Sequence, residues 1–155
     1  MRRALIALLV MCGFAVFGAS AQSCTVSATA MGFAPYNAHS GLAVDASSVV
    51  TTTCTGLLFL GVSYEVRLDG GQEADILARK MRLGVSGNTL GYQIYLNAGR
   101  TNVWGNGVQG SVYTGTMLLG LFARTQTRTV YGRIPGGQMV MAGDYTDGPV
   151  MTVIY

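Results

Sequence analysis

Residues 62–68 read Val62-Ser63-Tyr64-Glu65-Val66-Arg67-Leu68, and they alternate apolar and polar side chains without a break. Because successive side chains of a β-strand point to opposite faces of a sheet, this period predicts a strand with one buried face and one solvated face. The same period returns at residues 90–96, and residues 49–54 are rich in valine and threonine, which suit a pleated surface. These segments together indicate an all-β protein.

More β-strands are expected on both sides of this stretch, because turn sequences separate the remaining short apolar segments. Asp69-Gly70-Gly71, Gly105-Asn106-Gly107 and Asp147-Gly148-Pro149 are typical of turns. One short helical turn is expected at residues 72–79. Short strands and turns at this interval predict a single antiparallel β-sandwich domain. The other expected strands lie at residues 25–30, 79–85, 117–122, 129–134 and 150–155.

The composition agrees with one folded domain. The chain has 155 residues, of which 50% are hydrophobic and 11% charged, so it is too apolar for a disordered chain. Its length leaves room for one core. The formal net charge is +3, but removal of Arg2 and Arg3 with an N-terminal leader leaves eight basic side chains against seven acidic ones. No nucleic-acid partner is expected from so balanced a charge.

The first 21 residues have the pattern of an export signal. Arg2 and Arg3 precede an apolar run that ends at Gly18, and Ala19-Ser20-Ala21 offers the small side chains that signal peptidase requires. A membrane-spanning helix needs about 20 apolar residues, so an anchor is the weaker interpretation. We therefore expect a signal peptide at residues 1–21, a mature domain at residues 22–155, and contact with the membrane only during export.

The cysteines predict one disulfide. Cleavage after Ala21 removes Cys12 and leaves Cys24 and Cys54, which an oxidising compartment allows to pair. A metal site is the weaker alternative, because two cysteines and the single His39 lack the number and spacing of zinc ligands. Neither a metal nor a cofactor is expected.

No group of side chains predicts catalysis. His39 and Asp45 lie near several serines, but the Gly-x-Ser-x-Gly sequence of a nucleophile turn is missing, and an exposed loop histidine is the simpler interpretation. The basic cluster at residues 79–82 is typical of a charged strand edge. Tyr36 and Trp104 form a candidate ligand loop, although a lone tryptophan in a β-sandwich more often belongs to the core. An enzyme is therefore not expected.

Several different segments, taken in their order along the mature chain, together resemble the sequence of a known family. The most specific are Tyr131-Gly132-Arg133-Ile134-Pro135 and Ala142-Gly143-Asp144-Tyr145-Thr146-Asp147. The others are Cys24-Thr25-Val26-Ser27, Phe33 with Pro35-Tyr36, residues 50–54, 64–68, 79–81 and 90–95, Val103-Trp104-Gly105, and Gln138. This set resembles the spore coat protein U domain, the fold of pilins in archaic chaperone–usher systems. The resemblance implies an antiparallel immunoglobulin-like sandwich that lacks its last strand.

The resemblance also implies a function. In such pilins a periplasmic chaperone first fills the groove left by the missing strand, and an N-terminal donor strand of the next subunit fills it in the fibre. A structural or adhesive subunit of a surface fibre, active in attachment and biofilm, would then have a chaperone, an usher and sister pilins as partners. It would pass through the periplasm to the cell surface. The strand edge that meets donor or chaperone would hold Val150, Thr152, Ile154 and Tyr155.

The chain departs from the pilin pattern ahead of its first mature cysteine. A donor segment needs about ten residues, whereas cleavage after Ala21 leaves Gln22 and Ser23. We therefore expect a subunit that accepts a donor strand but supplies none, as at the tip of a fibre. The alternative is a complete secreted sandwich that binds a glycan or another surface ligand through its loops.

Overall fold

The computed structural model describes residues 22–56, 61–120 and 122–155. Within these ranges the regular structure is all β-strand apart from a 3-10 turn, η1 (Gly71–Glu73), and no helix is long and apolar enough to cross a membrane. The expected signal peptide lies outside the described residues. The strands are β1 (Ser23–Ala28), β2 (Val44–Thr55), β3 (Gly61–Leu68), β4 (Lys80–Leu83), β5 (Thr89–Gly91), β6 (Gln93–Tyr95), β7 (Tyr113–Leu118), β8 (Arg124–Ile134), β9 (Tyr145–Thr146) and β10 (Met151–Ile154).

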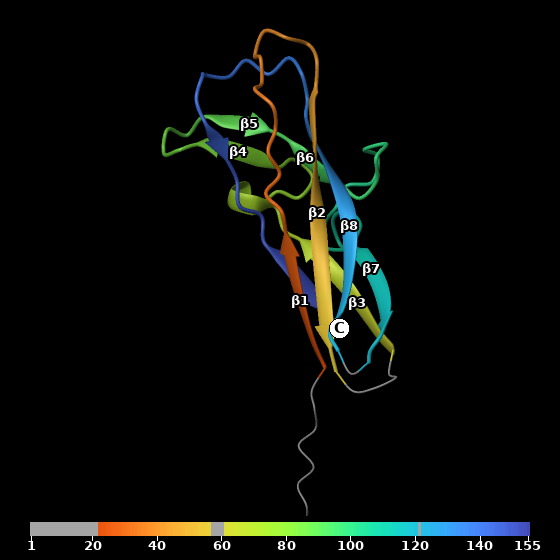
Figure 1. Ribbon diagram of the computed structural model, residues 1–155. Helices are drawn as coiled ribbons and strands as arrows, with labels where there is room; N and C mark the ends of the chain where they lie inside the picture. The colour runs from red at the N-terminus through yellow and green to blue at the C-terminus, as the bar shows by residue number, and fades with distance from the viewer. Residues whose placement is uncertain (1–21, 57–60, 121) are drawn as a thin grey trace, which may run out of the picture.

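The strands form three antiparallel sheets. Their orders are β1-β2-β8-β6, β10-β3-β7 and β5-β4-β9. In Figure 1 the first two sheets lie one behind the other, and the third, smaller sheet stands toward the end where β2 begins. The prediction of an all-β antiparallel sandwich is therefore confirmed.

The core lies between the two larger sheets and follows the predicted alternation. Val62, Tyr64, Val66 and Leu68 of β3 are all at most 4% exposed, while the side chains between them are exposed or half-buried. Burying one such side chain stabilises the fold by about 1.5–3 kcal/mol. Trp104 is 2% exposed and donates its indole N–H to the Val66 carbonyl (3.0 Å), so its ring belongs to this core.

The predicted disulfide is present. Cys24 of β1 and Cys54 of β2 lie directly opposite each other in the sheet, with their Cα atoms 4.1 Å apart, and their sulfur atoms are bonded. Both cysteines are buried. The bond therefore fixes the edge strand β1 to the centre of its sheet.

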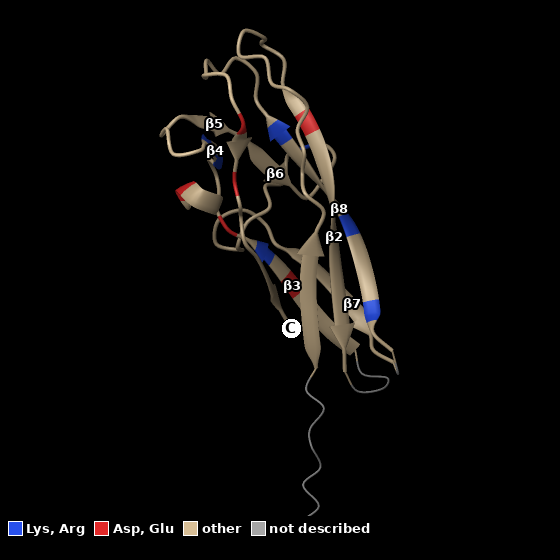
Figure 2. Ribbon diagram, turned by 60° about the vertical axis from the view of Figure 1, so that its left-hand side comes forward, with Lys and Arg blue, Asp and Glu red and all other residues tan. Residues whose placement is uncertain are grey.

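Several element boundaries differ from expectation. The segment at residues 90–96 is divided into β5 and β6, because the Tyr92 N–H donates to the Arg79 carbonyl (3.0 Å) and the chain changes sheets there. β7 begins at Tyr113, ahead of the strand expected at residues 117–122, and the helical turn is shorter than residues 72–79. Figure 2 shows charged residues scattered along the ribbon.

The basic cluster needs a correction. Lys80 and Arg82 are exposed on β4, but Arg79 just before it is 0% exposed, so the expected charged edge does not include it. Its guanidinium donates to backbone carbonyls that converge on one point and to the Gln93 side chain (2.5 Å). The carbonyls are those of Leu68, Asp69, Ile76 and Trp104. Burial lowers the pKa of this guanidinium, and the nearby Tyr92 and Asp69 oppose that shift.

Candidate functional site

A groove with mainly apolar lining runs between two segments from opposite ends of the described chain. Its N-terminal wall is residues 28–36, which follow β1, and its C-terminal wall is residues 140–151, which lead into β10. Two cavities of about 560 and 360 Å³ lie along it. They are parts of one groove because both are lined by Met31, Phe33, Met81 and Tyr145.

The N-terminal wall lies beyond the end of β1 and is not part of any sheet. The Thr29 N–H donates to the Val49 carbonyl (3.0 Å), and beyond it residues 30–36 belong to no strand of the described structure. Met31 and Phe33 turn inward over Gly132 of β8, where an added Cβ would lie 2.2 Å from the Met31 sulfur and 2.7 Å from the Phe33 ring. A glycine at position 132 therefore leaves the space that this wall occupies.

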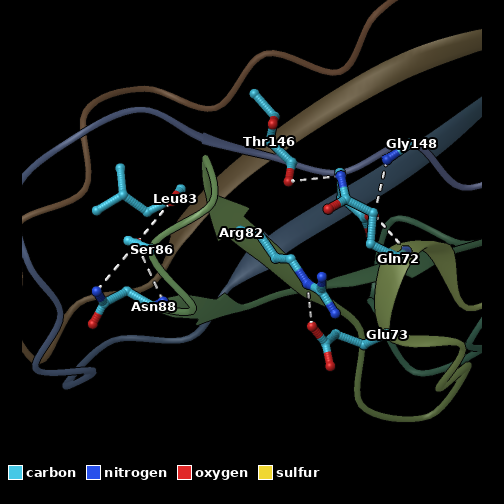
Figure 3. A network of polar contacts seen from close by, with 9 residues as sticks. Gln72, Glu73, Arg82, Leu83, Ser86, Asn88, Thr146 and Gly148 are labelled. Carbon is cyan, nitrogen blue, oxygen red and sulfur yellow. Dashed lines mark hydrogen bonds and ion pairs between the residues drawn. The ribbon is translucent and has the colours of Figure 1, made fainter.

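The C-terminal wall is fastened to the loop that contains η1. One carboxylate oxygen of Asp147 accepts from the backbone N–H groups of Gln72 and Gly148 (both 2.8 Å), and the other accepts from the Tyr92 hydroxyl (2.6 Å). Figure 3 shows Gln72 beside Thr146 and Gly148. Burial and the bond to Asp147 raise the pKa of Tyr92, so its hydroxyl stays protonated and remains a donor. The hydrogen bonds of Asp147 thus fix the C-terminal wall to Gln72 and Tyr92.

Tyr36 and Gln138 hold the far end of the groove together. The Gln138 N–H donates to the Tyr36 hydroxyl (2.7 Å), and the Gln138 side chain exchanges two hydrogen bonds with the backbone of Gly91 (2.8 and 2.9 Å). Tyr36 lines the larger cavity and Trp104 the smaller one, so the two candidate ligand residues lie at different parts of the groove. Since Trp104 is buried, a stacking role for its ring loses its support.

The terminal strand β10 has one paired edge and one open edge. It lies at the end of the order β10-β3-β7, and no other described strand bonds to it. The Asp69 N–H donates to the Val150 carbonyl (3.1 Å), which orients residue 150 toward β3. Because backbone groups alternate between the two edges of a strand, those of Thr152 and Ile154 also face β3. The backbone groups that face the open edge are those of Met151 and Val153.

The side chains of the expected donor-strand edge are exposed. Val150, Ile154 and Tyr155 are 61%, 43% and 52% exposed, and Thr152 is exposed as well. The half-buried Met151 and Val153 pack against the core. These two side chains therefore face the interior, and the four residues of the expected edge have exposed side chains.

The edge strand β1 lies beside β10 (Figure 1). No hydrogen bonds join the two strands within the described residues, since β1 pairs with β2 alone. The Thr29 bond to β2 sets the alternation on this side, so the backbone groups of Val26 and Ala28 face away from β2. The facing edges of β1 and β10 are therefore both open. The line along which these two strands lie side by side, called the seam below, continues into the groove.

His39 and Asp45 do not form a catalytic pair, because the Asp45 carboxylate is bound by two arginines. Both carboxylate oxygens of Asp45 accept from Arg133 (2.7 and 2.9 Å), and Arg100 adds an ion pair at 3.2 Å. The hydrogen bond from Arg133 lowers the pKa of Asp45. His39 is exposed, with its backbone N–H donating to the Asn37 side chain (3.0 Å). Over residues 22–56, 61–120 and 122–155, no cluster of three or more potential metal ligands occurs.

Sequence reasoning missed the N-terminal wall and the roles of Asp147 and Gln138. The alternation of Met31 and Phe33 with small residues was a usable signal for an extended segment with an inward face. The role of Asp147 in fastening this wall could not be predicted, because the Gln72 and Tyr92 groups that it binds come from sequence positions far away.

Comparison with known proteins agrees with this architecture. The family model named Spore Coat Protein U domain matches residues 12–152. Protein U of Myxococcus xanthus is 35% identical over 85 residues, which are 55% of this chain and 45% of that relative, so the match spans less than half of the relative's length. A chain in the CsuC–CsuE chaperone–tip adhesion subunit pre-assembly complex, from the archaic chaperone–usher Csu pili of Acinetobacter baumannii, has a similar fold. The TM-score is 0.60 at 19% identity, over 87% of this chain and 40% of that one. By its sequence match and its fold, the chain belongs to the Spore Coat Protein U domain family.

Proposed function

We propose that this protein is an exported subunit of a chaperone–usher type surface fibre, with a structural and not an enzymatic role. Its groove accepts an extended donor strand from a neighbouring subunit. The observation that carries the proposal is the pair of open edges, β1 and β10, on either side of a seam that leads into an apolar groove. Family membership and the fold shared with a chain of the Csu complex support it.

The chemistry of the groove suits a strand better than a small molecule. Open edges offer unpaired N–H and C=O groups at the spacing of a β-ladder, and an inserted strand bonds to them while its alternate side chains fill the apolar space. The ionisable carboxylates among the lining residues are Asp144 and Asp147, and Asp147 already accepts three hydrogen bonds. Binding would thus depend on backbone pairing and apolar burial.

The same groove would be covered by a periplasmic chaperone before assembly. Bare apolar surface costs about 25 cal/mol per Å² and invites edge-to-edge association. Val150, Ile154 and Tyr155 form an exposed apolar surface on and beside β10, which a chaperone would cover. An usher and sister pilins complete the set of partners.

The proposed place of the subunit is the end of a fibre, where it would serve attachment and biofilm formation. With cleavage after Ala21, Gln22 and Ser23 precede Cys24 and span about 7 Å when extended. That length does not cross a neighbouring subunit, so the subunit would accept a strand without supplying one.

A donor peptide from the N-terminus of a sister subunit is expected to stabilise the purified mature chain. At a free concentration of 100 times its Kd, a ligand specific for the folded state adds about 2.7 kcal/mol to the free energy of unfolding. Thermal unfolding with increasing peptide measures this, and a peptide of the same composition with its alternation scrambled is the control. Co-expression of the chaperone should also raise the periplasmic yield. A lone chain that is a stable monomer, with a Tm that neither peptide nor chaperone changes, would refute the proposal.

A further inference from the structure

Methionines gather around the groove. Those of the described chain that line it are Met31 on the N-terminal wall, Met81 on the floor, and Met141 and Met151 on the C-terminal wall. The other two are elsewhere: Met117 is buried on β7, and Met139 is 74% exposed and lines neither cavity. Every side of the groove therefore carries a methionine.

A methionine-lined groove changes shape at low cost. The methionine side chain is unbranched, with three rotatable bonds and a polarisable sulfur, so it fills gaps of different shape. Much of both walls is irregular backbone, since residues 30–36 and 140–144 belong to no strand. The core between the sheets differs, because Val50, Val66 and Val130 are fully buried β-branched side chains with restricted rotamers.

We propose that these methionines make the groove adaptable, so that it accepts donor strands whose inward side chains differ in size. This inference rests on the proposed function, because it concerns the specificity of the same groove. A rigid apolar pocket discriminates by about 10–200-fold for one methylene. Flexible methionine-rich surfaces repack around different partners and lose most of that discrimination. A subunit with such a groove would join more than one kind of sister subunit.

The test uses synthetic strand peptides that share one host sequence. Each has about 12 residues of alternating valine and threonine between terminal lysines, enough to run along one wall, and its central inward residue is Ala, Val, Leu or Phe. The mature chain should bind all of them with Kd values within about fivefold of one another. The variant Met31→Ile/Met151→Ile, which stiffens one position on each wall, should spread these values by about 30-fold. Met117→Ile is the matched control and should behave as the unmodified chain.

Methionine methyl NMR on the unmodified chain gives a readout that needs no variant. The methyl signals of the groove methionines should shift by different amounts with each peptide, while the Met117 signal stays in place. If the unmodified chain and Met31→Ile/Met151→Ile show the same spread of Kd values among the peptides, the groove is not adaptable, although it still binds peptides. The same conclusion would follow if every peptide gave identical methyl shifts. Failure of every peptide to bind would overturn this inference together with the proposed function.

Discussion

Arg79→Met is expected to lower the free energy of unfolding by about 4 kcal/mol, because it removes every hydrogen bond of a fully buried guanidinium and takes a donor from the buried carbonyls of Leu68, Asp69 and Trp104. The acceptors are four backbone carbonyls and the Gln93 side-chain oxygen, and they come from β3, β6, and the loops that contain Ile76 and Trp104. Arg79 thus ties the two larger sheets to the loop beside the groove. Urea unfolding followed by circular dichroism measures the loss.

Two further variants make this result specific. Arg82→Met changes an exposed arginine on β4 that pairs with Glu73, and a surface ion pair of this kind is worth at most about 1 kcal/mol. Arg79→Lys keeps the positive charge but loses the planar arrangement of donors, so its stability should fall between those of the unmodified chain and Arg79→Met. If Arg79→Met unfolds at the same urea concentration as Arg82→Met, the buried guanidinium does not hold the fold together.

Loss of the disulfide is expected to cost about 3 kcal/mol in the double variant Cys24→Ala/Cys54→Ala. The bond closes a loop with a sequence separation of 30 residues, and its removal frees the unfolded chain more than the folded one. It also releases β1, the edge strand next to the groove, so peptide binding should weaken as well. Urea unfolding with and without a reductant compares the two chains; the reductant should affect only the unmodified chain. A double variant as stable as the oxidised chain would show that the bond is not structural.

Local periodicity predicted the parts of the fold that it controls. The alternation at residues 62–68 became β3 with its predicted buried face, and the valine- and threonine-rich segment became part of β2. The disulfide followed from counting cysteines. These features depend on neighbouring residues in the sequence or on the number of cysteines, and both can be read from one sequence.

The candidate site was less predictable because tertiary contacts create it. Burial of Arg79 depends on carbonyls that converge from separate loops, and no pattern around residue 79 distinguishes it from the exposed Arg82. The division of residues 90–96 at Tyr92 depends on a backbone bond to Arg79. Likewise, the groove forms where residues 28–36 and residues 140–151 line the same cavities. The alternation of side chains within one segment does not predict which distant segment will lie opposite it.

Amide hydrogen exchange of β10, measured by NMR with and without a donor peptide, tests the central claim most directly. The amides of Met151 and Val153 face the open edge, so the account predicts that a bound donor strand slows their exchange by at least about tenfold. Those of Thr152 and Ile154 already face β3 and should exchange slowly in both states, which makes them internal controls. A peptide that binds but leaves exchange at Met151 and Val153 unchanged would contradict the claim that the groove is completed by a strand paired with β10.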